Sequence, residues 1–470
     1  MGYWTTFLDF VIQNKDPRRS WPMIEWLASF RLNMSSNAAF KETSKISLLE
    51  HSILDLGWHF QLEKPILEDF LAHLDHPYKG VREVVGLTLA SIYRTQYHES
   101  YKDVATLLAS EKAVSSLGSR PYKPTEEFGN TLTEVFGKIE KWRGERPAGL
   151  QTPSSYTMAS KTVLAWLEHA LCSFSCTEYL PFFPTTFLEP LLHMMDIKED
   201  PDLQALAYSV FRHLGNIPYR SGEEAPFVDA LIRIGRTATS WHQRLRVMIN
   251  IQAIYFRHLF LMPRHRQLAL FDCIASMLHD TQIEVRVGAS TTLSGMIRCS
   301  PISLRTKVIT DLCEKFTDLL AKNPLPRKRG PGTPTPDQNK LVLTRHAAVL
   351  GLGALVQAFP YTSPPPSWVP QVLATLALKA AGDPGVVGKS AKSIVSDFKK
   401  TRQDTWHIDI KVSLVFAVLL IWGICACANV KYRHSSRNRS RIWRVCCGRA
   451  ISPDRVSFQL SPISTRYSEL

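Results

Sequence analysis

A short pattern returns about every forty residues along this chain of 470 residues. It is a pair, most often an apolar residue and then an arginine, and an apolar or small residue follows seven positions after the second member. From Gln204 onward the second members lie 42, 40, 59 and 43 residues apart, and the 17 residues from Asn323 to Asn339 account for the excess in the longest step. The pairs are Val81-Arg82, Leu203-Gln204, Leu245-Arg246, Val285-Arg286, Thr344-Arg345 and Val387-Gly388.

Two copies of this repeat show its internal structure. The first reads as a helix over residues 66–74, a turn, and a second helix over 81–93, and the other reads as helices over 268–278 and 284–297. Within both second helices the apolar residues return at helical spacing, so that each helix has one buried stripe. A helix pair repeated every forty residues predicts an all-α, HEAT or armadillo-like α-solenoid of antiparallel helix pairs.

The repeat also predicts which residues are structural. We expect Val81, Arg82, Val285, Arg286 and Arg345 to define the repeat. Three aspartates stand just before the second helices, where a carboxylate can accept hydrogen bonds from free backbone N–H groups. These aspartates, which we expect to cap the helices, are Asp75, Asp280 and Asp383.

The net charge of +14 is unevenly spread. Residues 411–470 hold ten Lys and Arg against two Asp and Glu, whereas the other 410 residues hold 46 against 40. The body is only mildly basic, so the total charge does not predict a nucleic-acid site, and none is assigned. The nine cysteines are irregularly spaced, as expected of reduced, buried thiols in a cytosolic or nuclear protein.

The sequence offers no motif for catalysis. A Gly-rich phosphate loop, a G-x-S-x-G elbow and an H-E-x-x-H zinc motif are all missing from it. Cys172 and Cys176 lie four residues apart and could share a helix face, but no second pair of ligands lies near them in the sequence, which favours core packing over a metal site. We therefore predict a protein without catalytic residues, cofactor or metal.

A basic cluster, Arg327-Lys328-Arg329, lies between prolines in the stretch that interrupts the repeat. Exposed basic residues in an extended segment are typical of a nuclear localisation signal. Contact with a polyanion and a merely solvated loop are the alternatives.

Several stretches in the second half resemble the C-terminal part of the large HEAT-repeat proteasome activators, the proteasome activator complex subunit 4 family. They are residues 280–297 (DTQIEVRVGASTTLSGMI), 343–359 (LTRHAAVLGLGALVQAF), 366–370 (PSWVP) and 397–406 (DFKKTRQDTW). The basic insertion ending PRKRGPG also stands where the family carries one. Family members are several times longer, so this chain resembles their last quarter.

The resemblance implies a non-catalytic scaffold that caps the 20S proteasome core particle. Such a protein binds the α-ring and promotes degradation of peptides and unfolded proteins without ATP or ubiquitin. The family is found mainly in the nucleus, so the resemblance implies location in the nucleus and cytoplasm. The family is also linked to DNA repair and to turnover of acetylated histones on chromatin. The alternatives are a karyopherin-type or adaptor-type HEAT solenoid and a membrane-tethered scaffold.

The C-terminal residues depart from the family pattern. In the family the chain ends in a hydrophobic residue, tyrosine and any residue, and this tail opens the proteasome gate, whereas this chain ends in Ser468-Glu469-Leu470. Before that end, residues 412–428 (VSLVFAVLLIWGICACA) carry no charge and could form a single transmembrane helix about 26 Å long. The other interpretation, which we favour, is a terminus read through from a splice donor after Lys411.

The predicted organisation follows from these observations. It comprises HEAT-like repeats over 1–142 and 162–322, a loop over 143–161, a Pro-rich basic insertion over 323–339, a region over 340–411 that resembles the activator C-terminus, the apolar segment 412–428, and a basic, disordered tail over 429–470.

Overall fold

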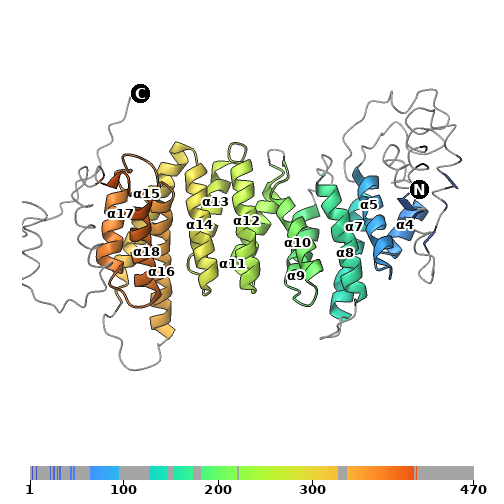
Figure 1. Ribbon diagram of the computed structural model, residues 1–470, viewed down its shortest axis with the longest axis horizontal. Coiled ribbons are helices and arrows are strands. Elements are labelled where there is room, and N and C mark those ends of the chain that lie inside the picture. Colours follow the sequence, from blue (N-terminus) through green and yellow to red (C-terminus); the bar gives the residue numbers. More distant parts are fainter. Residues whose placement is uncertain are drawn as a thin grey trace, which may run out of the picture.

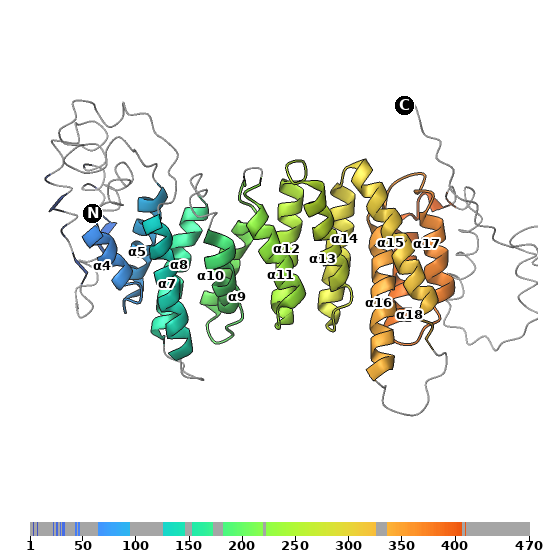
Figure 2. The same ribbon diagram turned by 180° about the vertical axis from the view of Figure 1, so that it is seen from behind.

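The computed structural model describes residues 64–94, 126–145, 153–172, 182–219, 222–325, 336–406 and 409, together with isolated positions before residue 64. Within these residues every regular element is a helix, which confirms the predicted all-α fold. The helices stack along one long axis, with α4 and α5 at one end and α17 and α18 at the other (Figure 1 and Figure 2). The arrangement is the predicted solenoid.

The helices form two sets that alternate along most of the chain. The first helices of the pairs are α4 (Lys64–Ala72), α7 (Glu126–Glu145), α9 (Leu188–Met195), α11 (Ala225–Thr237), α13 (Arg264–Met277), α15 (Ile302–Lys322) and α17 (Val369–Thr375). The second helices are α5 (Lys79–Arg94), α8 (Ser155–Leu171), α10 (Pro201–Leu214), α12 (Trp241–Arg257), α14 (Ile283–Cys299), α16 (Pro336–Gln357) and α18 (Val386–Thr401). There are also two π-helical turns in the described residues: η4 (Phe183–Phe187) directly precedes α9, and η5 (Leu376–Ala380) directly follows α17.

Both helix pairs predicted in detail are present. The pair α4 and α5 and the pair α13 and α14 begin and end within a few residues of the expected bounds. Their predicted stripes are buried, since Val81, Val85, Val285, Ala289 and Leu293 are all inaccessible to solvent. Local apolar spacing was sufficient to predict these helices because each needs only one buried face.

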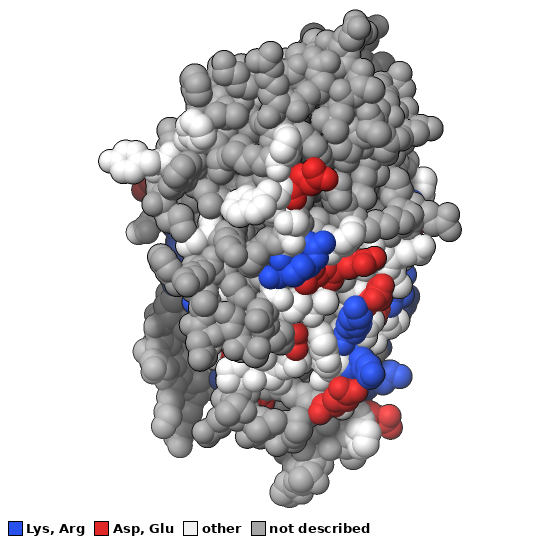
Figure 3. Space-filling view, turned by 90° about the vertical axis from the view of Figure 1, so that its right-hand side faces the viewer, with Lys and Arg blue, Asp and Glu red and all other residues white. Residues whose placement is uncertain are grey.

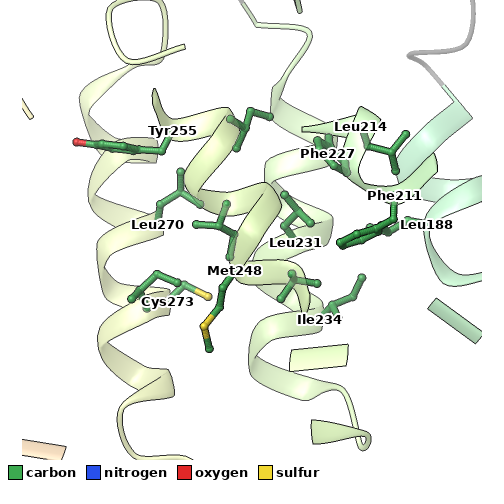
Figure 4. Packing of buried hydrophobic residues seen from close by; sticks show 14 of the residues in the cluster. Leu188, Phe211, Leu214, Phe227, Leu231, Ile234, Met248, Tyr255, Leu270 and Cys273 are labelled. Carbon is green, nitrogen blue, oxygen red and sulfur yellow. The ribbon is translucent and has the colours of Figure 1, made fainter. Parts of the chain in front are cut away.

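The core is continuous from one helix pair to the next. Figure 4 shows Leu188 of α9 and Phe211 of α10 followed by Leu231 of α11, Met248 of α12 and Leu270 of α13, all of which are buried. Full burial of a side chain of this size contributes about 1.5–3 kcal/mol. Since each pair buries its apolar face only against its neighbours, stability is shared along the stack.

Helix α16 is buried on all sides over residues 345–356. It packs against α14, α15 and α18, and small residues allow these neighbours to approach closely. A Cβ atom placed on Gly351 would lie 2.5 Å from Cδ2 and Cζ of Phe316, and one on Gly353 would lie 3.0 Å from Cγ1 of Ile394. The two glycines are therefore needed for helix packing.

Two predicted loop boundaries differ from the structure. The loop expected over 143–161 is shorter, because α7 continues to Glu145 and α8 begins at Ser155. Ser154 and Thr157, whose polar character favoured a loop, instead form a reciprocal cap at the start of α8. The insertion expected over 323–339 is shorter at its end, since α16 begins at Pro336, and proline is well accepted in a first helical turn.

Candidate functional site

In three helix pairs an arginine holds the turn that precedes the second helix. These arginines are Arg82, Arg244 and Arg286, and Nη1 of each donates to the backbone carbonyls six and five residues earlier. The two distances are 2.5 and 3.0 Å for Arg82, 2.6 and 3.1 Å for Arg244, and 2.7 and 3.0 Å for Arg286. The adjacent Val81 and Val285 are fully buried. Each arginine thus satisfies carbonyl groups of its own turn, and beside Arg82 and Arg286 a buried valine anchors the helix in the core.

The predicted register of the repeat in α12 is wrong by two residues. Arg244, not Arg246, is the fourth residue of its helix and makes the contacts that Arg82 makes in α5. Seven residues later Ile251 is fully buried, whereas Ala253, which follows Arg246 by seven, is half-buried. The apolar Leu245 favoured the wrong register, and counting from the start of the helix would have corrected it.

Several arginines also join neighbouring repeats. Arg244 donates to both carboxylate oxygens of Asp280, at 2.6 and 3.0 Å, and Arg345 donates to Asp383 Oδ2 through Nε at 2.8 Å and Nη2 at 2.6 Å. Asp280 also accepts a hydrogen bond from the backbone N–H of Gln282, at 2.9 Å, as expected of a residue just before a second helix. The sequence did not predict that the carboxylates of Asp280 and Asp383 each bind an arginine of the preceding pair. Charge-assisted bonds of this kind are stronger than bonds to neutral N–H groups.

The Asp280 carboxyl shows the electrostatic effect of this arrangement. Burial alone would raise its pKa, but the hydrogen bonds from Arg244 and from the Gln282 N–H, together with the charges of Arg244 and Arg286, outweigh burial and lower the pKa below its ordinary value. The carboxylate therefore stays ionised and paired at neutral pH.

Arg345 has the densest contacts of the predicted residues. Besides Asp383, it donates to the backbone carbonyls of Leu320 and Asn323, both at 2.7 Å, and of Lys379, at 2.6 Å. Its side chain is only 3% exposed. One guanidinium thus ties together α15, α16 and η5 around the start of the last pair.

A buried polar chain crosses three second helices. Arg286 Nε donates to His346 Nδ1 at 3.0 Å, and His346 Nε2 lies 3.0 Å from Ser390 Oγ. Burial, and then the charge of Arg286, lower the pKa of His346 to about 4. The imidazole is therefore neutral at physiological pH, with Nδ1 accepting from Arg286 and Nε2–H free to donate to Ser390.

Replacing His346 by glutamine should reduce the loss of stability on acidification. The unfolded state takes up a proton near pH 6.5, whereas the folded state does so only near pH 4, so protonation favours unfolding as the pH falls through that range. This group should cost on the order of 3 kcal/mol by pH 4. Urea unfolding from pH 7 to pH 4 measures the slope, with exposed His265→Gln as the matched control. Equal slopes for both variants would contradict the assignment.

Two surface cavities lie among the described residues, and charged side chains line both. One of about 730 Å³ lies between α5, α8 and α10, and one of about 520 Å³ contains Arg236 and Arg244. In the smaller cavity each arginine is already paired, Arg236 with Asp272 at 2.6 Å and Arg244 with Asp280. On the end face that carries α4 and α5, basic and acidic residues are likewise interleaved (Figure 3). The smaller cavity therefore presents no unpaired arginine that predicts a ligand.

The cysteines are less uniformly buried than predicted. Cys273 is buried, and burial raises its pKa to about 11, but Cys172 and Cys299 are exposed. Cys172 Sγ lies 3.6 Å from His213 Nε2, a contact that the sequence could not show because 41 residues separate the two. Cys176 lies outside the described residues. Among the described residues no group of three or more His, Cys, Asp or Glu could hold a metal ion.

Other predicted features also lie outside the described residues. They are the basic cluster Arg327-Lys328-Arg329, the apolar segment 412–428, the tail 429–470 and its end Ser468-Glu469-Leu470. In the part of the chain that the structure describes, no helix is long and apolar enough to cross a membrane.

Comparison with known proteins gives consistent matches. Residues 342–414 match the family model described as "Proteasome activator complex subunit 4-like, C-terminal". The chain is 28% identical over 421 residues to proteasome activator complex subunit 4 from Homo sapiens, covering 86% of this chain and 21% of the relative. It is 27% identical over 383 residues to proteasome activator BLM10 from Saccharomyces cerevisiae, covering 80% and 17%. Proteasome activator subunit 4 from Arabidopsis thaliana is 23% identical over 372 residues, covering 73% and 19%.

Stacked helix pairs joined by arginine–carboxylate contacts define a HEAT-like α-solenoid. The matches extend over most of the chain and include the region in which Arg345 and α16 hold the last pairs together. The chain is similar to the proteasome activator complex subunit 4 family over most of its length, and it spans about a fifth of the length of the curated relatives it matches.

Proposed function

We propose that this chain is a non-catalytic scaffold that binds the α-ring of the 20S proteasome core particle. In doing so it promotes degradation of peptides and unfolded proteins without ATP or ubiquitin. One observation carries the proposal: complete helix pairs continue through the described part of the region that matches the activator family, residues 342–406, with the Arg345–Asp383 contact between them. An intact array of this kind supports binding because the surface of a solenoid depends on every repeat being stacked.

Purified chain should associate with purified 20S core particle in the absence of ATP. Biolayer interferometry measures the dissociation constant, and hydrolysis of a fluorogenic peptide measures activation, for which we expect an increase of several-fold. The variant Arg345→Met should weaken binding, because it disrupts the last pairs, whereas the matched control Arg233→Met should bind like the wild type. Absence of binding by the wild-type chain would reject the proposal, and binding without faster hydrolysis would reject activation alone.

Location in the nucleus as well as the cytoplasm, and with it a role in DNA repair and in turnover of acetylated histones, is part of this proposal. It is supported by the basic cluster Arg327-Lys328-Arg329. Replacing all three residues by alanine should shift a fluorescent fusion of the chain from the nucleus to the cytoplasm. The control replaces the exposed lysines Lys389 and Lys392 of α18. An unchanged nuclear fraction in the triple variant would contradict the assignment.

A further inference from the structure

Large apolar side chains are exposed along one edge of the solenoid. This is the upper edge in Figure 1, and three of the connections from a second helix to the next first helix lie on it, at residues 258–263, 300–301 and 358–368. Five residues at these connections, here named the connection ridge, are strongly exposed: Phe256 (64%), Phe260 (87%), Leu261 (52%), Ile302 (72%) and Tyr361 (79%). Aromatic side chains, here Phe256, Phe260 and Tyr361, are enriched at protein interfaces.

Side-chain contacts join the three connections into one surface. Arg264 donates to Ser303 Oγ at 3.2 Å and to the Ser303 carbonyl at 3.1 Å, which ties the first connection to the second. Arg298 Nη2 donates to the Gln357 carbonyl at 3.0 Å, and the guanidinium of Arg305 lies 5.5 Å from the centroid of the Phe359 ring, which ties the second connection to the third. The exposed residues therefore lie on consecutive, mutually attached repeats.

The ridge is held rigid at its most exposed point. The Met262 N–H donates to the His258 carbonyl at 2.8 Å, and the buried Gln267 Nε2 donates to the carbonyls of Leu259 and Met262 at 2.5 and 3.1 Å. Phe260 and Leu261 thus project from a backbone whose hydrogen bonds are made. A preorganised surface loses less conformational entropy when a partner binds.

The three connections that carry the ridge are basic. The three connections with their flanks, residues 256–268, 298–307 and 358–368, contain six Arg and Lys and no Asp or Glu. Of the six, Arg266 lies 3.7 Å from the buried Glu224 and 3.9 Å from the exposed Asp229. No carboxylate in the described part of the chain pairs with the other five, which are Arg257, Arg264, Arg298, Arg305 and Lys307. A complementary surface is therefore acidic around apolar pockets.

We propose that the connection ridge is the surface through which the solenoid docks on the 20S core particle, against an acidic protein surface with apolar pockets. This inference rests on the proposed function. Protein is favoured over nucleic acid because exposed apolar area dominates the ridge, and because Arg264 and Arg298 already use guanidinium N–H groups on neighbouring connections. Binding to a phosphate backbone depends instead on many free cations.

The test compares two double variants of the full chain. Each variant replaces one exposed apolar residue and one basic residue by glutamate. The ridge variant is Phe260→Glu with Arg257→Glu, and the control is Ile283→Glu with Lys315→Glu at the opposite edge, where Ile283 is 41% exposed. Circular dichroism verifies that each variant keeps the helical content of the wild type. We expect the ridge variant to bind purified 20S core particle at least about tenfold more weakly, and the control to stay within about twofold of the wild type.

The possible failures can be told apart. Wild-type chain that does not bind the core particle rejects the proposed function, and this inference with it. Equal affinities of the ridge variant and the wild type reject the ridge while leaving the proposed function standing. The same chains are also tested on duplex DNA and on anionic phosphatidylserine vesicles. Loss of either of those interactions in the ridge variant, with core-particle affinity unchanged, would assign the ridge to a different partner and overturn the proposal.

Discussion

Replacing Arg345 by methionine should lower the free energy of unfolding of the C-terminal repeats by about 3–5 kcal/mol. The guanidinium is 3% exposed and makes hydrogen bonds to the Asp383 carboxylate and to three backbone carbonyls. Methionine fills much of the volume but leaves a carboxylate without its partner in a site that is only 12% exposed. Urea unfolding followed by circular dichroism measures the change, and hydrogen exchange in α16 and α18 reports whether it is local.

An exposed arginine provides the control for this prediction. Arg233 pairs with Glu189 at 2.8 Å, but the two side chains are 54% and 55% exposed, so Arg233→Met should change stability by less than about 1 kcal/mol. In the double variant Arg345→Met with Asp383→Leu the orphaned charge is gone, and part of the lost stability should return. If Arg345→Met is no more harmful than Arg233→Met, the contacts of Arg345 do not stabilise the array.

Replacing Gly351 by valine should destabilise the same region by about 2–3 kcal/mol. The Cβ atom alone would lie 2.5 Å from Cδ2 and Cζ of Phe316, which is fully buried, so α15 and α16 must move apart to accommodate it. Interiors are close-packed and resist such shifts. The midpoint of urea unfolding measures the effect, and faster hydrogen exchange in α15 and α16 should accompany it.

Two further variants separate packing from helix propensity. Gly137 lies at an exposed position of α7, and a Cβ atom added to it would have nothing within 4 Å, so Gly137→Ala should raise stability by about 0.5–1 kcal/mol. Phe316→Ala removes the ring that valine would strike, and the double variant should therefore lose less stability than the sum of the two single variants. Strict additivity would show that the ring is not what restricts residue 351.

Most of the helices could be predicted because their signals are local. The stripe that contains Val81 and Val85 and the stripe that contains Val285 and Ala289 each lie within one helix, and a repeated period shows that the units recur. The register of α12 could not be fixed in this way, because Arg244 and Arg246 lie two residues apart and only the helix start distinguishes them. Helix α16 is buried all round, so its apolar residues show no single stripe from which its neighbours could be inferred.

For the candidate site residues, the sequence likewise predicted their identity but not their contacts. The sequence predicted that Arg286 and Arg345 matter to the repeat, but not that Arg286 meets His346 or that Arg345 meets Asp383, since those partners lie 60 and 38 residues away. The connection ridge was not predicted either. Phe260, Ile302 and Tyr361 are far apart in the sequence, and an apolar residue beside a turn is as compatible with burial as with exposure.

The sequence by itself determined that this protein is a stack of helix pairs with a period of about forty residues, and it indicated the activator family. It did so because helix formation and one-sided burial depend on residues three and four apart, which a single segment contains. Only the tertiary structure decided which carboxylate each arginine binds, how closely α15 approaches α16, and which apolar side chains remain exposed on one edge. Those properties depend on how separate repeats are placed against each other, and no single repeat carries that information.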